Sequence, residues 1–247
     1  MNKLNFILSA ALAIAPFQDI SAQLWIGGDD FNSSTLDSSK WTGGGSSFVK
    51  TTSAVSFFSS VNTGTFGDGI AWSQNLPKNQ DWTVTVEASI SPLFSTSGSS
   101  KFAEALLVVA SNDFSSYFTN CLHRDDTFDI VPNWEVNNGG NQELLTTIGL
   151  ESVLLRMKFD ASAQTLTSSH ASLTNPTSFT ATKTLTTANW GNLNDFVVTI
   201  GIYTKDTSIS SGQLILDNFS AVPEPSSLSL LVAGGAVLVA ARRRRVV

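Results

Sequence analysis

The sequence predicts an all-β fold, an antiparallel β-sandwich, from three observations. The chain of 247 residues carries 35 serines and 25 threonines, which form helices less readily than Ala, Leu, Glu and Lys. Hydrophobic residues make up 42% of the chain and include 16 Phe and 6 Trp, enough to build a core. Short runs of alternating polarity recur between clusters of Gly, Ser and Asn, and no window forms an amphipathic helix of a dozen residues.

Three segments have the period of two that is typical of a half-buried strand. In Trp82–Ile90 every even-numbered residue is apolar and every odd-numbered residue is polar. Residues 153–159 and 196–202 alternate in the same way. Phe102–Ala110 is almost continuously apolar, which is typical of a strand covered on both faces. Many short strands in about 200 residues predict a sandwich or jelly roll.

The first 22 residues have the pattern of a secretory signal peptide. Lys3 precedes the apolar run 4–17, and a cleavage site follows at Ile20-Ser21-Ala22. A buried first helix is the alternative, but the run lacks amphipathic spacing. We therefore predict a signal helix at 1–22, handled by the Sec translocon and signal peptidase, and a β-sandwich domain at 23–221.

The last part of the chain, residues 222–247, contains three features in order. The first is Pro223-Glu224-Pro225, whose prolines are not expected to join a helix or a central strand. The second is the apolar run 228–241, a short transmembrane helix of 14 residues where a comfortable span needs ~20. The third is a basic end that would stay in the cytoplasm. It consists of Arg242, Arg243, Arg244 and Arg245.

This order of features resembles the PEP-CTERM sorting signal of exopolysaccharide-producing Gram-negative bacteria. The resemblance implies an exported protein that is anchored in the membrane for a time and processed by an exosortase, a membrane cysteine peptidase. The protein would then reach the cell surface, the outer envelope or the extracellular matrix. An ordinary C-terminal membrane anchor is the alternative interpretation.

The charge of the central part of the chain restricts its partners. Residues 24–222 carry 9 basic and 18 acidic side chains, which argues against nucleic acid as a partner. The single cysteine, Cys121, excludes an internal disulfide framework and a zinc site with several cysteines.

Both ends of this central part resemble concanavalin A-like lectin and glucanase domains. Residues 29–41 contain the acidic pair, the Phe, the small polar turn and the Leu-Asp-x-x-x-Trp with which such domains commonly begin. They close on a strand with an Asp in an apolar setting, as Asp217 is within residues 214–219. The resemblance implies one concanavalin A-like jelly roll, and we expect its segments 24–40 and 212–220 to be adjacent.

No catalytic residue is identified, and the chain is predicted not to be an enzyme. Laminarinase-like glycosidases on this fold carry Glu-x-Asp-x-x-Glu or Glu-x-Asp-x-Glu on one strand, and neither pattern occurs here. Glu87 and Glu104 are each alone on their strands and are expected on solvated strand faces. Cys121 and His123 share a face, but a buried Cys beside a surface His is favoured over a catalytic dyad.

Calcium is the only cofactor that the sequence suggests, because it prefers oxygen ligands. The resemblance implies a structural calcium ion held by Asp217 and by backbone carbonyls near the first strands. A hydrogen bond in a turn or cap is the alternative role for Asp217. The carboxylates Asp125, Asp126 and Asp129 offer a second place for calcium in a loop, but they lack an Asp-x-Asp-x-Asp-Gly pattern.

Carbohydrate binding is the expected function of a jelly roll without catalytic carboxylates, because sugars stack on aromatic rings. Trp72, Trp134 and Trp190 lie beside Gly, Asn and Asp and are the candidate platform, with core packing as the alternative for each. The sequence thus favours a non-enzymatic surface or matrix protein that binds an extracellular polysaccharide. A divergent polysaccharide hydrolase or lyase and a purely structural coat component are the alternatives.

Overall fold

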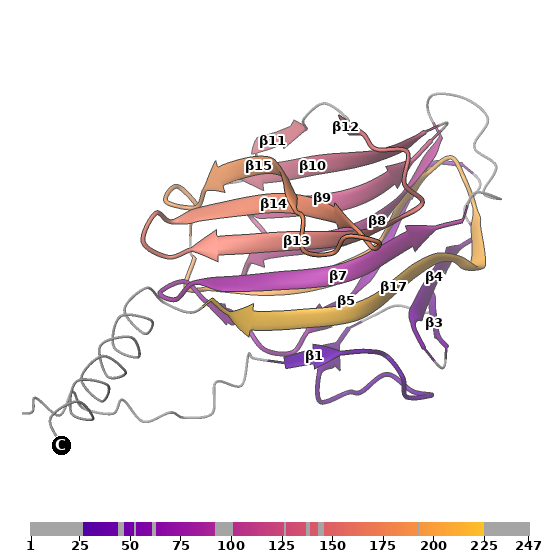
Figure 1. Cartoon of the computed structure of the whole chain (residues 1–247), viewed down its shortest axis with the longest axis horizontal. Coiled ribbons are helices and arrows are strands. Elements are labelled where there is room, and N and C mark those ends of the chain that lie inside the picture. Colours follow the sequence, from indigo (N-terminus) through magenta and orange to yellow (C-terminus); the bar gives the residue numbers. More distant parts are fainter. Residues whose placement is uncertain are drawn as a thin grey trace, which may run out of the picture.

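A computed structural model describes residues 27–43, 47–51, 53–60, 63–91, 101–125, 127–136, 139–142, 146–191 and 193–224. Every regular element in these residues is a β-strand, and the strands pair antiparallel in two stacked sheets (Figure 1). The predicted all-β antiparallel sandwich is confirmed. Within the described ranges no helix is long and apolar enough to cross a membrane. The predicted helices at 1–22 and 228–241 lie outside those ranges.

The first sheet, sheet A, has eight strands. In order they are β15 (Thr180–Thr186), β14 (Thr165–Ser172), β13 (Ser152–Asp160), β7 (Trp82–Ile90), β17 (Ile209–Pro223), β4 (Val55–Ser59) and β3 (Phe48–Lys50), while β1 (Gly27–Asp29) pairs with β17. The last strand that the structure describes, β17, therefore lies in the middle of sheet A, between β7 and β4.

The second sheet, sheet B, has nine strands. In order they are β11 (Gly139–Gln142), β10 (Phe128–Val136), β9 (Tyr117–Arg124), β8 (Phe102–Ser111), β16 (Asp195–Lys205), β5 (Thr65–Trp72) and β2 (Trp41–Thr42), while β12 (Thr146–Thr147) pairs with β10 and β6 (Leu76–Pro77) pairs with β16. The almost continuously apolar segment predicted as a doubly covered strand is β8.

The core lies between the two sheets and follows the alternation in the sequence. The even-numbered residues of Trp82–Ile90 are at most 1% exposed, as are the predicted inward residues of β13 and β16. The ring of Trp82 packs against Phe159 of β13 and Phe196 of β16, with centroids 5.3 and 5.2 Å apart. One side chain thus ties sheet A to sheet B, and rings of this size supply much of the apolar area that drives folding.

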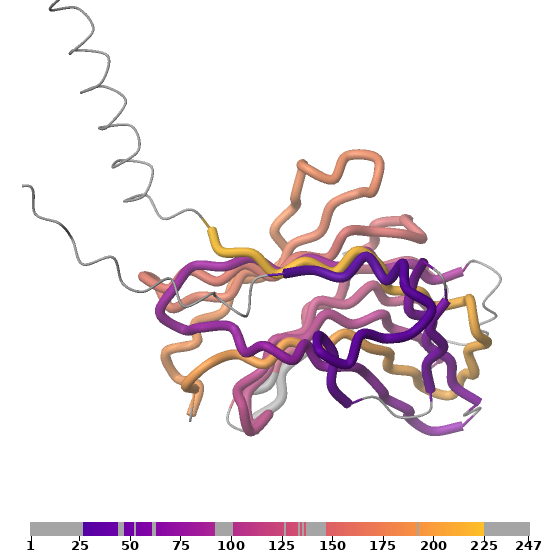
Figure 2. The backbone as a smooth tube through the Cα atoms, turned by 90° about the horizontal axis from the view of Figure 1, so that it is seen from below, coloured from indigo at the N-terminus to yellow at the C-terminus, as the bar shows by residue number. Residues whose placement is uncertain are grey.

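The first and last strands of the described residues, β1 and β17, lie side by side, as the indigo and yellow segments of Figure 2 show. Gly28 of β1 pairs with Ser220 of β17. A Cβ atom on Gly28 would lie only 2.6 Å from the carbonyl oxygen of Phe219, so this close approach requires glycine. The predicted adjacency of segments 24–40 and 212–220 is confirmed for the residues that the structure describes.

Strand β17 ends at Pro223, two residues beyond the predicted domain end at Ala221. Pro223 pairs with Trp82 of β7, so the expectation that it cannot join a central strand is wrong. The Glu224 amide donates to the Asp81 carbonyl at 3.1 Å, and the alternation of an antiparallel ladder then points the nitrogen of Pro223 away from β7. On the side of β17 opposite β7, β1 pairs with β17 only as far as Ala221. The missing N–H of Pro223 therefore costs no ladder hydrogen bond among the described residues.

Candidate functional site

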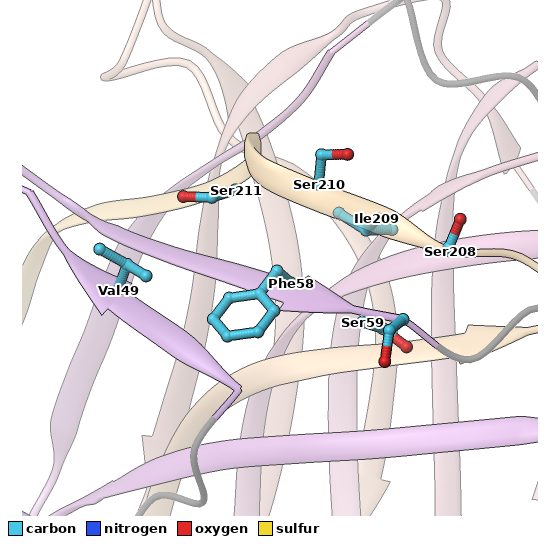
Figure 3. Close-up of a pocket in the computed structure, with 8 residues that line it drawn as sticks. Val49, Phe58, Ser59, Ser208, Ile209, Ser210 and Ser211 are labelled. Carbon is cyan, nitrogen blue, oxygen red and sulfur yellow. The ribbon is translucent and has the colours of Figure 1, made fainter.

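An open cleft of about 530 Å³ lies at the edge of sheet A, where β3 and β4 meet the beginning of β17 (Figure 3). Phe58 of β4, Val49 of β3 and Ile209 of β17 supply its apolar surface, and Val49 is 43% exposed. Serine residues surround this apolar surface: Ser59, Ser60, Ser208, Ser210 and Ser211. The cleft therefore combines one aromatic ring with several hydroxyl groups.

A bulge in β17 forms one wall of the cleft. The pairing of β17 with β4 is irregular between residues 209 and 214, so the intervening residues leave the ladder. Gly212 has φ +86°, a left-handed conformation that suits glycine, and its amide donates to Ser56 Oγ at 2.6 Å. The amide of Ser210 donates to Gln213 Oε1 at 2.8 Å. The first hydrogen bond fixes the serine-bearing bulge against β4, and the second closes the bulge within β17.

The composition of this cleft suits a sugar ring. The apolar face of a sugar packs on an aromatic side chain such as the half-buried Phe58, while its hydroxyls exchange hydrogen bonds with serines. The described lining residues include no carboxylate, imidazole or thiol, the groups that carry acid–base and nucleophilic catalysis most often. Sequence reasoning missed this site, although Ser-Ser-Gly at 210–212 inside a strand was a signal for a bulge.

The tryptophans that the sequence offered as a sugar platform lie inward. Trp72 and Trp190 are 4% and 5% exposed and belong to the core, so neither ring has a free face for a sugar. Trp134 is partly buried, with its ring 6.5 Å from that of Phe118 and the Lys183 ammonium 4.6 Å from its centroid. The structure therefore corrects the expectation that Trp72 and Trp190 form a sugar-binding platform. Large apolar rings gain more free energy from packing in the core than from exposure to water.

Glu104 and His123 form a buried pair on the neighbouring strands β8 and β9. Nδ1 of His123 lies 2.9 Å from Oε1 of Glu104, and Nε2 lies 3.9 Å from Oδ2 of Asp125. The side chains of Glu104 and His123 are each 8% exposed. The expectations of a solvated Glu104 and a surface His123 are therefore wrong. The sheet register, which sequence alternation does not reveal, places these residues opposite each other.

The residues beside the Glu104–His123 pair do not form an activated nucleophile. Burial raises the pKa of the Cys121 thiol well above its ordinary value, and the charge of Glu104 raises it further. The thiol stays protonated, so the structure agrees with a buried Cys121 and offers no Cys121–His123 dyad. Asp129 lies opposite His123 on β10 and is 1% exposed, and its Oδ2 accepts a hydrogen bond from the Thr127 hydroxyl.

The surroundings of Asp217 do not fit the calcium site that the resemblance implies. Both carboxylate oxygens of Asp29 accept hydrogen bonds, one from the Phe31 amide and one from the Trp41 indole. The Lys50 ammonium donates to the Phe31 carbonyl oxygen, and its charge interacts with those of Asp29 and Asp217. An ammonium group thus already supplies the positive charge here and uses the nearby carbonyl.

The contacts of Asp217 are those of a strand residue and not those of a metal ligand. It pairs with Glu87 across β17 and β7, and it accepts a hydrogen bond from the Asn218 amide at 2.7 Å. Burial raises the pKa of Asp217, and the negative charge of Glu87 raises it further. The described part of the chain contains no group of three His, Cys, Asp or Glu residues arranged to hold a metal. Asp126, which belongs to the second place that the sequence offered for calcium, lies outside the described residues.

Two residues of the predicted sorting motif, Pro223 and Glu224, belong to the described structure. The Thr83 hydroxyl donates to Oε1 of Glu224, and the Lys158 ammonium lies 3.5 Å from its Oε2. Pro225 and the arginines at 242–245 lie outside the described residues.

Comparison with known proteins agrees with the interpretation of the tail. Residues 221–245 match the PEP-CTERM protein-sorting motif. The chain therefore carries a sorting motif that implies export and anchoring in the membrane at the C-terminal end before cleavage. A comparison with curated proteins gives no match.

Solved structures resemble the sandwich itself. A mutant of the GH43 protein BlXynB from Bacillus licheniformis aligns with a TM-score of 0.57 at 14% identity, over 80% of this chain and 39% of that one. The chain thus spans about two fifths of the length of that protein. The CBM2 module of Dit from Lactobacillus casei BL23 phage J-1 aligns with a TM-score of 0.56 at 7% identity, over 79% and 94%.

A lectin has the same fold. Lectin I from Ulex europaeus, in complex with the methyl glycoside of α-L-fucose, aligns with a TM-score of 0.54 at 10% identity, over 79% of this chain and 97% of that one. At such low identities the likeness shows the lectin-like jelly-roll fold and not the activity.

Proposed function

We propose that this exported protein is displayed on the cell surface or in the extracellular matrix, where it binds a polysaccharide without cleaving it. The observation that carries this proposal is the cleft beside Phe58, in which an aromatic ring is surrounded by serine hydroxyls. The sorting motif at 221–245 supports the location, since it implies export and processing by an exosortase-type peptidase.

The chemistry of the cleft favours binding over hydrolysis. Glycosidases place two carboxyl groups on either side of the scissile bond, about 5–9.5 Å apart. The described lining of the cleft holds none, and the buried Glu104 is paired with His123 on sheet B. The similar structures include both a lectin and a GH43 protein, so the fold supports either activity and the lining is what favours binding.

Retention on insoluble polysaccharides tests the binding proposal. We expect the full-length chain in detergent to be retained by at least one of a panel of β-glucans, agars and alginates, and Phe58→Ala to lose that retention. Phe114→Ala is the matched control, because Phe114 is 50% exposed in the turn between β8 and β9 of the other sheet. Equal retention of Phe58→Ala would exclude the cleft as the binding site. Soluble sugar products would support the hydrolase or lyase alternative instead.

Mass spectrometry of the protein from its native host tests the sorting proposal. We expect a surface-released product that is cleaved near Pro225. A chain that ends at Val247 and occurs only in membranes would reduce the tail to an ordinary anchor.

A further inference from the structure

The corner formed by β7 and β13 holds the glutamate of the sorting motif. Both carboxylate oxygens of Glu224 have partners, the Thr83 hydroxyl on Oε1 and the Lys158 ammonium, 3.5 Å away, on Oε2. The backbone amide of Glu224 donates to the Asp81 carbonyl at 3.1 Å. The charge of Glu224 also interacts with the Arg156 guanidinium on β13. Side chains from two strands and a backbone carbonyl therefore converge on a single residue.

The residues just before Glu224 belong to the same attachment. Val222 and Pro223 continue the antiparallel pairing of β17 with β7, opposite Thr83 and Trp82. The Glu224 side chain is only 31% exposed, although it follows the end of β17. The sequence led us to expect prolines that join neither a helix nor a central strand, whereas residues 222–224 of this segment are bound to the sandwich.

We propose that the sandwich contains an intramolecular binding site for Glu224, and that this site withholds the sorting glutamate from the peptidase while residues 222–224 are docked. The inference rests on the proposed processing by an exosortase-type enzyme. A peptidase that reads the glutamate has to take over its hydrogen bonds, and bonds to an ionised group are the strong ones. Processing therefore requires the end of β17 to separate from β7, an opening local to the last residues of the strand.

The test changes the receptor side of this contact and leaves the motif intact. Thr83→Val combined with Lys158→Met removes both partners of the carboxylate while keeping the size and strand preference of residue 83. Thr85→Val combined with Lys205→Met is the matched control. Thr85 lies two residues after Thr83 on the same face of β7, and Lys205 lies on β16 of sheet B. The full-length chains are expressed in the native host, and loss of the tail is followed by pulse–chase.

We expect the Thr83→Val/Lys158→Met chain to be processed roughly tenfold faster than the wild type, because hydrogen bonds to a charged group no longer oppose recognition. The control pair should be processed at the wild-type rate. Equal or slower processing of the receptor variant would overturn the inference. If the wild type and all variants keep the tail, the proposed sorting fails instead.

A second measurement tests the docking without any peptidase. Amide hydrogen exchange of the purified full-length chain in detergent should show protection at Glu224 in the wild type and in the control. In the receptor variant this protection should fall by about tenfold, because the carboxylate no longer anchors the segment. Rapid exchange at Glu224 in the wild type would overturn the inference independently of processing.

Discussion

Nδ1 of His123 lies 2.9 Å from Oε1 of Glu104, and this contact joins β8 to β9 on the face of sheet B that points away from the core. The two side chains are almost fully buried, so each supplies most of the hydrogen bonding that the other has lost to water. Neither residue lines the cleft beside Phe58. We therefore assign the pair a structural role.

Glu104→Ala should lower the free energy of unfolding by roughly 2–4 kcal/mol, because it leaves the buried imidazole without its carboxylate partner. Glu87→Ala is the control, since Glu87 faces the carboxylate of Asp217 and removing it relieves a repulsion. Urea denaturation measures both variants. A loss in Glu104→Ala no larger than that in Glu87→Ala would contradict the structural role.

Asp217 should make the stability of the protein fall as the pH rises. Its pKa is raised above the ordinary 3.8 by burial and by Glu87, so the folded state binds this proton more tightly than the unfolded chain does. The unfolding free energy then decreases as the pH rises from the ordinary value through the raised one. Asp217→Asn should remove this decrease and be more stable than the wild type at neutral pH. Parallel pH profiles of the two proteins would refute this assignment.

Calcium should leave the melting temperature of the wild type unchanged, because the Lys50 ammonium already interacts with Asp29 and Asp217 and uses the Phe31 carbonyl. A calcium ion at a hundredfold its dissociation constant would add roughly 2.7 kcal/mol, which melting curves with calcium and with chelator would resolve. Lys50→Met should lower the stability by about 1–2 kcal/mol in both buffers, since the carbonyl loses its donor. A higher melting temperature of the wild type in calcium would show that the ion displaces the lysine.

Gly201→Ala should destabilise the sandwich by roughly 1–3 kcal/mol, the usual effect of overpacking. A Cβ atom on Gly201 of β16 would lie 2.3 Å from the backbone carbonyl oxygen of Asp68, and a backbone atom in a paired strand cannot move aside cheaply. Gly67→Ala, on the neighbouring β5, is the control, because its Cβ would meet Tyr203 at an ordinary 3.4 Å. Similar thermal unfolding of the two variants would disprove this difference.

Sequence alternation predicts which face of a strand is buried, and this succeeded for the core. The inward residues of β7, β13 and β16 are those that the period of two identifies. Alternation does not reveal register, so pairs joined across strands were missed: Glu104 and His123 are 19 residues apart, and Thr83 and Glu224 are 141 apart. The direction in which a large ring points also depends on residues distant in the sequence. Gly and Asn residues near Trp72 and Trp190 indicate loops, but they do not show where each ring packs.

The central place of β17 in sheet A determines when the sandwich can close on the proposed export route. Until this strand arrives, β3 and β4 lack the neighbour that links them to β7, and β1 lacks its partner, so sheet A would be in three separate pieces. A chain that crosses the membrane from its N-terminal end delivers residues 209–223 last of the described strands. On the proposed route the apolar run 228–241 enters the membrane directly afterwards, so translocation stops at about the moment when the sandwich first becomes able to close.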